Sequence, residues 1–320
     1  MNVVATFVTS VYELVNMETI KEIADNMEVD NIWKSVAKEL DKRPLVHGNI
    51  LVQEDGVLVS FRHSTDQGTV GPTRRAESCN DTPWDQNGNG FTFTEAKAKP
   101  FPYIAVQGIL ITDDPEQIRY KYENEEELWQ KLTFEEFRSD LLPYLAQRVV
   151  SSLVSYLRIK CSTEFAVRDL LTTFAHHPFV YDIELDYIGE SIESFLSVQS
   201  KINYNVKTVK LYGNWPQSTA DTIVQLMLQF GGTGVDVRET PIRFDQRFFD
   251  ELEDQWTDES ELPLQLKGKH DGRLLDMENN TSEIENEDTG SLYKFIMEFE
   301  RDNEFCLYGF VWTLEQRLAH

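Results

Sequence analysis

One segment of the chain has oxygen-bearing side chains at a spacing that could bind a metal ion. Asp85-x-Asn87-x-Asn89-Gly90 copies the first half of an EF-hand calcium loop, in which oxygen ligands alternate along the chain. The twelfth position of such a loop needs a bidentate Glu, but Ala96 stands there and Glu95 comes one residue early. We therefore favour a glycine-rich turn, and calcium binding at Asp85–Gly90 stays open.

Two further segments could take part in ligand chemistry. His176-His177 precedes Pro178, where a cation would cap the C-terminal end of a helix, and no third metal ligand is in register. Gly231-Gly232-Thr233-Gly234 precedes a strand, whereas a phosphate-binding loop must follow a strand and open a helix. Nucleophile-elbow, zinc-protease, Walker and kinase motifs are not found in the sequence. We expect no catalytic residue, no metal and no cofactor.

A pattern of apolar residues recurs at a fixed spacing. Four copies begin 26 residues apart, and a fifth follows 29 residues later, at Val154, Val180, Val206, Gly232 and Glu261. The apolar residues form two columns: Leu157, Ile183, Val209, Val235 and Leu264 in the first, and Ile159, Leu185, Leu211, Val237 and Leu266 in the second. A period of about 20–29 residues with this core is typical of leucine-rich-type repeats.

Apolar stretches with helical spacing separate these copies. They lie at 165–174, 192–202, 219–230 and 244–256. A strand and a return helix within one such repeat leave short loops, as a parallel sheet with right-handed crossovers requires. The sequence therefore predicts an α/β fold in which residues 131–275 form a short leucine-rich-repeat-like solenoid. Such a solenoid presents a surface for partners and has no built-in catalytic pocket.

The residues between the apolar columns are expected to face outward from the strands. They form the columns Arg158, Glu184, Lys210, Asp236, Gln265 and Lys160, Asp186, Tyr212, Arg238, Lys267. Charge alternates along the first column, and each opposite-charge pair across neighbouring strands would stabilise the sheet by about 0.2–1 kcal/mol. The ladder either orders the strands or forms a recognition face. Its mixed signs argue against a nucleic-acid groove, and the candidate partner-binding residues are Arg158, Lys160, Glu184, Asp186, Lys210, Tyr212, Asp236 and Arg238.

Composition limits the partners and the compartment. The 320 residues carry a formal net charge of −25, which repels nucleic acid and anionic lipid and favours a basic or neutral partner, unless the charge only serves solubility. The widely spaced cysteines, Cys79, Cys161 and Cys306, indicate free thiols in a reducing compartment. The N-terminus lacks a signal-peptide pattern and no apolar run is long enough for a membrane span. We therefore expect a cytoplasmic or nuclear protein.

The part of the chain that precedes the repeats divides into two predicted segments. Residues 1–45 show apolar residues at helical spacing and are expected to form two or three short helices. Residues 46–130 are expected to form a small, mostly antiparallel β region, with a hairpin around Asp55 and a long polar loop at 66–90. An enzyme site in the loop-rich segment 62–102 is the one catalytic alternative.

The end of the chain divides in the same way. Residues 276–290 are acidic and polar, which predicts a mobile loop. Residues 291–320 contain two apolar runs around Asp302, which predict a hairpin that caps the open end of the sheet. Together with the preceding segments, they give five predicted parts of the chain.

Several short motifs in the repeat region resemble a known family. They are Tyr187-Ile188-Gly189-Glu190, Phe195-Leu196-Ser197-Val198-Gln199, Val209-x-Leu211-x-Gly213-Asn214-Trp215-Pro216-x-Ser218, Phe248-Phe249, Trp256 and Leu266-x-Gly268. They resemble the C-terminal region of the nematode-expanded F-box proteins with F-box-associated (FOG-2-homology-like) domains. At the N-terminus, Val4, Phe7, Val8, Val11, Leu14, Thr19-Ile20 and Trp33-Lys34-x-Val36 are similar to a degenerate F-box.

The resemblance implies a non-catalytic substrate receptor, in which F-box helices dock a Skp1-type adaptor of a cullin ubiquitin ligase and the C-terminal domain holds the target protein. The adaptor-binding residues carried over are Phe7, Val8, Val11, Leu14, Ile20, Ile23 and Trp33. Ala5 stands where the family usually has proline. A stand-alone scaffold or antagonist without ligase binding is therefore the alternative.

Overall fold

The computed structural model describes most of the chain after residue 44. The described residues are 45–63, 90–98, 104–118, 128–149, 156–177, 182–202, 206–228, 234–259, 264–271, 281–285, 292–299 and 303–312. Residues 1–44, with all seven predicted adaptor-binding residues, lie outside them, as do the polar loop up to Asn89 and Cys79. The chain divides into two compact units, Met1–Phe174 and Ala175–His320. Both units contain strands and helices, so the predicted α/β class is confirmed.

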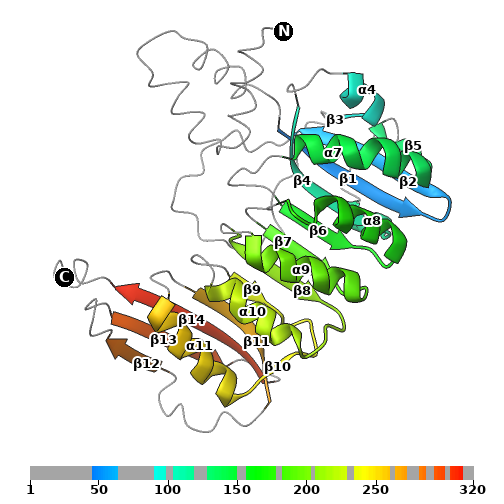
Figure 1. Cartoon of the computed structure of the whole chain (residues 1–320). Helices are drawn as coiled ribbons and strands as arrows, with labels where there is room; N and C mark the ends of the chain where they lie inside the picture. Colours follow the sequence, from blue (N-terminus) through cyan, green and yellow to red (C-terminus); the bar gives the residue numbers. More distant parts are fainter. Residues whose placement is uncertain are drawn as a thin grey trace, which may run out of the picture. The chain divides into compact units, whose positions relative to one another are not determined.

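Unit 1 contains a mixed sheet and a set of short helices (Figure 1). Its strands are β1 (Leu45–Gln53), β2 (Gly56–His63), β3 (Gly90–Phe91), β4 (Ala105–Thr112), β5 (Gln130–Leu132) and β6 (Tyr156–Lys160). Its helices are α4 (Phe93–Ala98), α5 (Pro115–Ile118), α6 (Phe134–Glu136), the π-helix η3 (Phe137–Leu141), α7 (Leu142–Arg148) and α8 (Glu164–Phe174). The strand order is β3-β2-β1-β4-β6, and β5 pairs with the free part of β2.

The predicted hairpin around Asp55 is confirmed, because β1 and β2 pair antiparallel from Val46–His63 to Gln53–Gly56. The prediction of a small, mostly antiparallel region at 46–130 omits one feature, the parallel pairing of β4. Strand β4 pairs in parallel with β1 and also with β6, so this region shares a sheet with the first copy of the repeat. Two parallel strands must be joined by a long crossover connection. The apolar sequences of β1 and β4 do not indicate which strand each will pair with, so this parallel pairing was not predictable from them.

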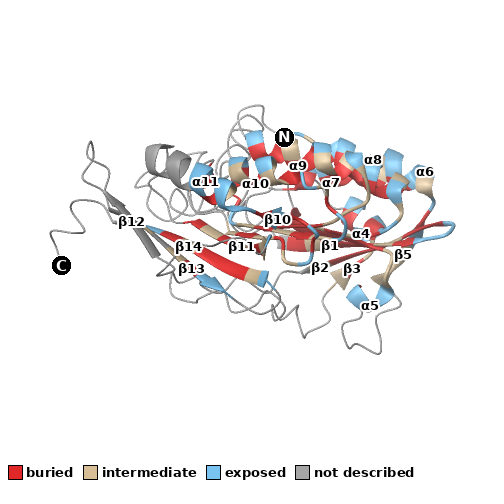
Figure 2. Cartoon of the chain, turned by 90° about the horizontal axis from the view of Figure 1, so that it is seen from below, coloured by how far each residue is buried: buried red, intermediate tan, exposed pale blue. Residues whose placement is uncertain are grey.

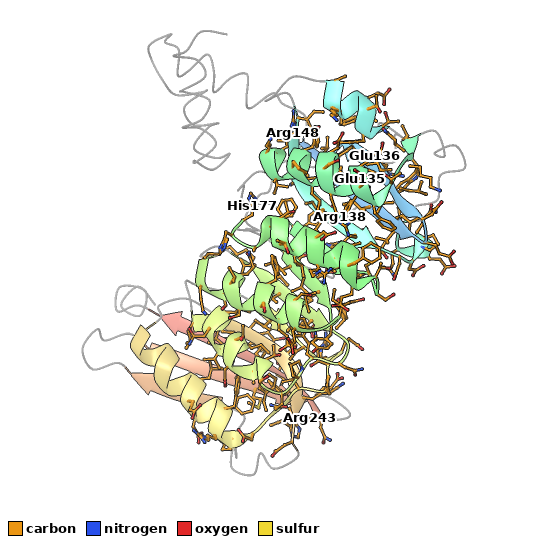
Figure 3. The ribbon with its side chains drawn as sticks, turned by 45° about the vertical axis from the view of Figure 1, so that its right-hand side comes forward. Glu135, Glu136, Arg138, Arg148, His177 and Arg243 are labelled. Carbon is orange, nitrogen blue, oxygen red and sulfur yellow. The ribbon has the colours of Figure 1, made fainter. Side chains whose placement is uncertain are left out.

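A capping box and an ion pair order the helices of unit 1. The backbone N–H of Glu136 donates to Thr133 Oγ1, and the Glu136 carboxylate accepts from the backbone N–H of Thr133, at 3.2 and 2.8 Å. Arg138, further along this helical segment, pairs with Asp169 of α8. Figure 3 shows Glu136 and Arg138 at this helix start. The ring of Phe134 also packs edge-on against Phe165, with centroids 4.6 Å apart.

Unit 2 contains parallel and antiparallel strands with longer helices. Its strands are β7 (Asp182–Asp186), β8 (Thr208–Tyr212), β9 (Gly234–Asp236), β10 (Arg243–Phe244), β11 (Leu264–His270), β12 (Thr281–Glu285), β13 (Leu292–Phe299) and β14 (Glu304–Trp312). Its helices are α9 (Glu190–Ile202), α10 (Thr219–Leu228) and α11 (Gln246–Glu259). Strands β7, β8, β9 and β11 run parallel, whereas β14, β13 and β12 continue the sheet antiparallel. In Figure 2 the three helices cover one face of these strands.

The constant spacing of the repeat predicts the strand positions correctly. Strands β6 to β9 begin at Tyr156, Asp182, Thr208 and Gly234, at the same interval that separates the first four copies in the sequence. Every residue of both apolar columns is buried, and the first and last of them, Leu157 and Leu266, are each 0% exposed. The fifth copy, however, is shifted by two residues: Val235 lies opposite Leu266, where the sequence pattern placed Leu264. More residues separate the fourth and fifth copies than separate the earlier ones. The register of β11 is therefore set by its backbone hydrogen bonds with β9 and β14.

The acidic segment at 276–290 is not a loop throughout, as the sequence predicted. Thr281–Glu285 form β12, which pairs antiparallel with β13 and places Glu283 opposite Lys294. An edge strand needs hydrogen bonds on one side only, and acidic side chains discourage pairing with another chain. Acidic composition alone therefore did not distinguish an edge strand from a loop.

The C-terminal apolar runs form strands β13 and β14, which pair antiparallel from Leu292–Trp312 to Phe299–Phe305. Asn303 in the connection has a φ of 62°, a conformation that Asn tolerates better than most residues. Strand β14 also pairs with β11, and β12 covers the other side of β13. The hairpin thus extends the sheet of unit 2 beyond its parallel part.

Gly108 in β4 leaves room for the ring of a neighbouring tyrosine. A Cβ atom at Gly108 would lie 2.3 Å from Cε1 and Cζ of Tyr156, whose hydroxyl is hydrogen-bonded to His47 Nδ1 at 2.8 Å. Because Tyr156 is buried and held by His47, its ring cannot turn away without losing this bond. We expect Gly108→Ala to lower the free energy of unfolding by about 1–3 kcal/mol, measured by urea denaturation.

Gly48, in the adjacent strand β1, is the matched control for Gly108. A Cβ atom at Gly48 would meet its nearest neighbours at 3.5, 3.6 and 3.8 Å, which are ordinary contacts. Gly48→Ala should be neutral or should stabilise the protein by about 0.4–1 kcal/mol, because the unfolded chain loses conformational freedom. Equal losses in the two variants would contradict the assigned role of Gly108.

Candidate functional site

A polar groove lies in unit 2 between α9 and α10, which Figure 1 shows side by side. Its volume is about 480 Å³, and its lining residues are Glu193, Ser194, Leu196, Ser197, Val198, Trp215, Ser218, Thr219 and Thr222. Glu193 lies in the first turn of α9, and Thr219 and Thr222 lie in the first turn of α10. The groove therefore begins where β7 and β8 reach their carboxyl ends, the edge at which open α/β sheets bind ligands.

The connection from β8 to α10 positions Trp215 at this groove. Gly213 has a φ of +84°, which L side chains rarely adopt, and its carbonyl accepts from the Trp215 N–H at 3.0 Å. The indole packs edge-on against the ring of Tyr187, with centroids 5.4 Å apart. Thr219 N–H donates to the Pro216 carbonyl at 3.0 Å, so Pro216 opens the turn that leads into α10. Trp215 is 1% exposed, so its indole is a buried part of this connection.

Gln217 holds this connection against β10. Its side-chain Nε2 donates to the Arg243 carbonyl at 2.7 Å, and its Oε1 accepts from the Arg243 N–H at 3.0 Å. Arg243 belongs to β10, and Figure 3 labels it. Two bonds from one side-chain amide restrain the loop at both backbone groups of Arg243. The groove thus has a restrained boundary on the α10 side.

Glu193 supplies the charge of the groove. Its Oε1 accepts a hydrogen bond from the hydroxyl of Tyr187 at 2.7 Å. This bond and the nearby carboxylates of Glu193 and Glu190 raise the pKa of Tyr187, so the tyrosine stays protonated and donates. Throughout the described part of the chain, no cationic side chain lies within ion-pair distance of Glu193. The groove therefore presents a carboxylate whose one described partner is a neutral hydroxyl.

The groove also contains neutral hydrogen-bonding groups. Ser194, Ser197, Ser218, Thr219 and Thr222 contribute hydroxyls. Trp215 Nε1–H is buried and has no hydrogen-bond partner among the described residues. A hydroxyl both donates and accepts, whereas the indole N–H only donates. Sequence reasoning missed this groove, because its lining combines residues from two helices that lie about one repeat apart; the Trp215-Pro216 pair after a strand was its one visible signal.

The predicted partner-binding residues lie on strands β6 to β9 or, for Arg238, just beyond β9. In unit 2 the register places Glu184 beside Lys210, Lys210 beside Asp236, and Asp236 beside Lys267. The sequence had placed Gln265 at the end of this row, so the two-residue shift of the fifth copy extends the alternation of charge to Lys267. In unit 1, Arg158 and Lys160 flank Ile159 on β6.

These charged residues form ion pairs with one another, one of them between strands and one within a single segment. Lys210 Nζ lies 3.3 Å from Glu184 Oε1, and Arg238 Nη2 lies 2.9 Å from Asp236 Oδ2. Glu184 is only 4% exposed, which contradicts its prediction as an outward-facing residue. Burial, followed by the Glu184 and Asp236 carboxylates, raises the pKa of Tyr212. The Glu184–Lys210 pair therefore joins β7 to β8, and the groove between α9 and α10 is the better candidate for binding.

Unit 1 contains a second cluster of buried polar groups, on β1 and β6. His47 and Tyr156 stack with centroids 5.2 Å apart, and the Arg158 guanidinium lies 4.9 Å from the Tyr156 ring centroid. Burial and the charge of Arg158 lower the pKa of His47 to about 3, so His47 is neutral at physiological pH. A neutral, stacked histidine with this hydroxyl partner is a packing element of the sheet.

The metal candidates from the sequence gain no support in the described ranges. No group of three or more His, Cys, Asp or Glu side chains there could hold a metal ion. Asp85, Asn87 and Asn89 lie outside the described residues, and Ala96, at the twelfth loop position, is buried in α4. Burial lowers the pKa of His177 to about 4. Cys161 and Cys306 are buried free thiols.

Comparisons with known proteins identify no relative. No protein-family model, no curated protein and no solved structure matches the chain. Among the described helices, none is long and apolar enough to cross a membrane.

Proposed function

We propose that this chain is a non-catalytic protein-recognition protein, built on leucine-rich-like α/β repeats. The observation that carries the proposal is the run of strands that begin at equal intervals, at Tyr156, Asp182, Thr208 and Gly234, with a helix after each of the first three. Repeats of this kind contact only their neighbours and create extended surfaces that bind partners. The fifth strand, β11, breaks the spacing, as terminal repeats often do.

The second part of the proposal is the role of substrate receptor in a Skp1–cullin ubiquitin ligase. It rests on the resemblance of residues 1–45 to a degenerate F-box. In this role, the helical segment docks the adaptor and the repeats hold the target protein. The charge of −25 favours a target with a basic surface, because long-range attraction raises association rates.

Co-elution with a Skp1-type adaptor tests the ligase role. We expect the purified full chain and the adaptor to co-elute from a size-exclusion column at micromolar concentration. Phe7→Asp and Leu14→Asp should each abolish co-elution, because a buried carboxylate in an apolar interface costs several kcal/mol. Circular dichroism of both variants should match the parent chain, which separates lost docking from lost folding.

Absence of co-elution would remove the ligase role and would leave a stand-alone scaffold or antagonist. Co-elution that persists in both aspartate variants would place the adaptor contact outside the F-box-like segment. The two results therefore distinguish the receptor from the scaffold.

A further inference from the structure

The groove between α9 and α10 has the dimensions of a short peptide site. Along α9 its lining runs from Glu193 to Val198, which is about 7.5 Å at 1.5 Å per residue. Two or three residues of an extended chain, at about 3.3 Å each, cover that length. The volume of about 480 Å³ lies in the range of ordinary ligand pockets, about 300–1,000 Å³.

The charge of the groove lining favours a cationic ligand. Glu193 alone is charged among the lining residues, and Tyr187 supplies its described hydrogen bond through one oxygen only. An ionised carboxylate offers about four acceptor sites, so a guanidinium or ammonium group can still bind. The exposed side chains of Glu190 and Asp221 add negative charge at the helix starts. An anionic ligand would be repelled by all three carboxylates.

The neutral groups of the groove match a polypeptide backbone. An extended peptide carries N–H donors and carbonyl acceptors in alternation. The hydroxyls of Ser197 and Thr222 can accept from N–H groups or donate to carbonyls, and Trp215 Nε1–H lacks a described acceptor. A hydrophobic ligand would leave these groups unsatisfied at a cost.

We infer that this groove binds a short, extended basic segment of a partner protein, with one arginine or lysine side chain paired to Glu193. The inference rests on the proposed recognition function and names the chemistry that the repeats select. It places the binding site on the helical side of unit 2, at the carboxyl ends of β7 and β8. The charged strand face keeps its separate role of ordering the strands.

A positional-scanning library of capped hexapeptides, presented to the immobilised full chain, tests this inference. We expect enrichment of Arg and Lys over Gln at one position by about five- to tenfold, as one charge-assisted hydrogen bond provides. Glu193→Gln should abolish this preference, because glutamine keeps the shape of the side chain and removes its charge. Glu251→Gln is the matched control: it also removes one negative charge from unit 2, and Glu251 lies on α11, outside the groove lining.

The outcomes distinguish failure of the groove proposal from failure of the proposed recognition function. A preference for basic residues that survives Glu193→Gln, or that Glu251→Gln abolishes equally, would overturn the assignment to Glu193. Enrichment of peptides without basic preference would also overturn it, while recognition by another surface would stand. A chain that co-elutes with the adaptor and enriches no peptide would overturn the groove alone, whereas a chain that does neither would count against both proposals.

Discussion

Replacement of Trp215 by alanine is expected to lower the free energy of unfolding by about 3–5 kcal/mol. Trp215 is the largest of the fully buried side chains in the described residues, at 1% exposure. It fills the space between the β8–α10 connection and Tyr187, with ring centroids 5.4 Å apart. Truncation at the β-carbon would leave a cavity, since the Gly213 turn and the Gln217–Arg243 bonds restrain the surrounding loop from collapsing.

Trp215→Phe is the graded control for this truncation. Phenylalanine keeps an aromatic ring against Tyr187, and no hydrogen bond to a described residue is lost, because the indole Nε1–H has none. We expect a loss of about 1–2 kcal/mol for this smaller cavity. Urea denaturation followed by far-ultraviolet circular dichroism measures both variants without relying on Trp215 fluorescence. A loss below about 1 kcal/mol for Trp215→Ala would mean that Trp215 does not support the core.

Replacement of Lys210 by methionine is expected to cost about 3–5 kcal/mol. The Glu184 side chain is 5% exposed and the Lys210 side chain is 20% exposed, with Oε1 and Nζ 3.3 Å apart. Lys210 also lies beside Asp236 in the next strand, and Asp236 keeps Arg238 as its ion-pair partner, 2.9 Å away, after the replacement. Methionine preserves most of the length of the side chain, so the main change is electrostatic.

A double variant and an exposed pair control for Lys210→Met. Adding Glu184→Gln to Lys210→Met should recover part of the lost stability, since the buried carboxylate that Lys210 paired with is then neutral. Arg247→Met should change the free energy of unfolding by less than about 0.5 kcal/mol, because the Arg247 and Glu251 side chains are 83% and 52% exposed. If urea denaturation gives equal effects for Lys210→Met and Arg247→Met, the strand ladder contributes no more than a surface ion pair.

The apolar columns show which part of the fold was predictable. Leu157, Ile183, Val209 and Val235 are buried as their spacing indicated, because alternation along a strand is a local property of the chain. The pairing of Val235 with Leu266 was not predictable from the same columns. Both Leu264 and Leu266 are apolar and buried, so either satisfies the pattern, and the backbone hydrogen bonds to two neighbouring strands select between them.

The candidate site also has one part that was predictable from the sequence and one part that was not. The alternating charges at Glu184, Lys210 and Asp236 were visible in the sequence as a ladder. The cross-strand pairing of Glu184 with Lys210 agrees with that prediction. The burial of Glu184 was not visible, since burial depends on what covers a strand. The groove was still harder to predict, because Glu193 and Thr222 become neighbours only when α9 packs against α10.

The sequence by itself determined the α/β class, the equal spacing of strands β6 to β9 and the hairpin around Asp55, because periodicity and turn residues act over a few residues. Tertiary structure decided the parallel placement of β4, the register of β11, the edge strand β12 and the groove at Glu193. Each of these depends on contacts between distant segments. Such contacts are selected by hydrogen bonding and packing across the whole sheet, and no local pattern of residue types encodes them.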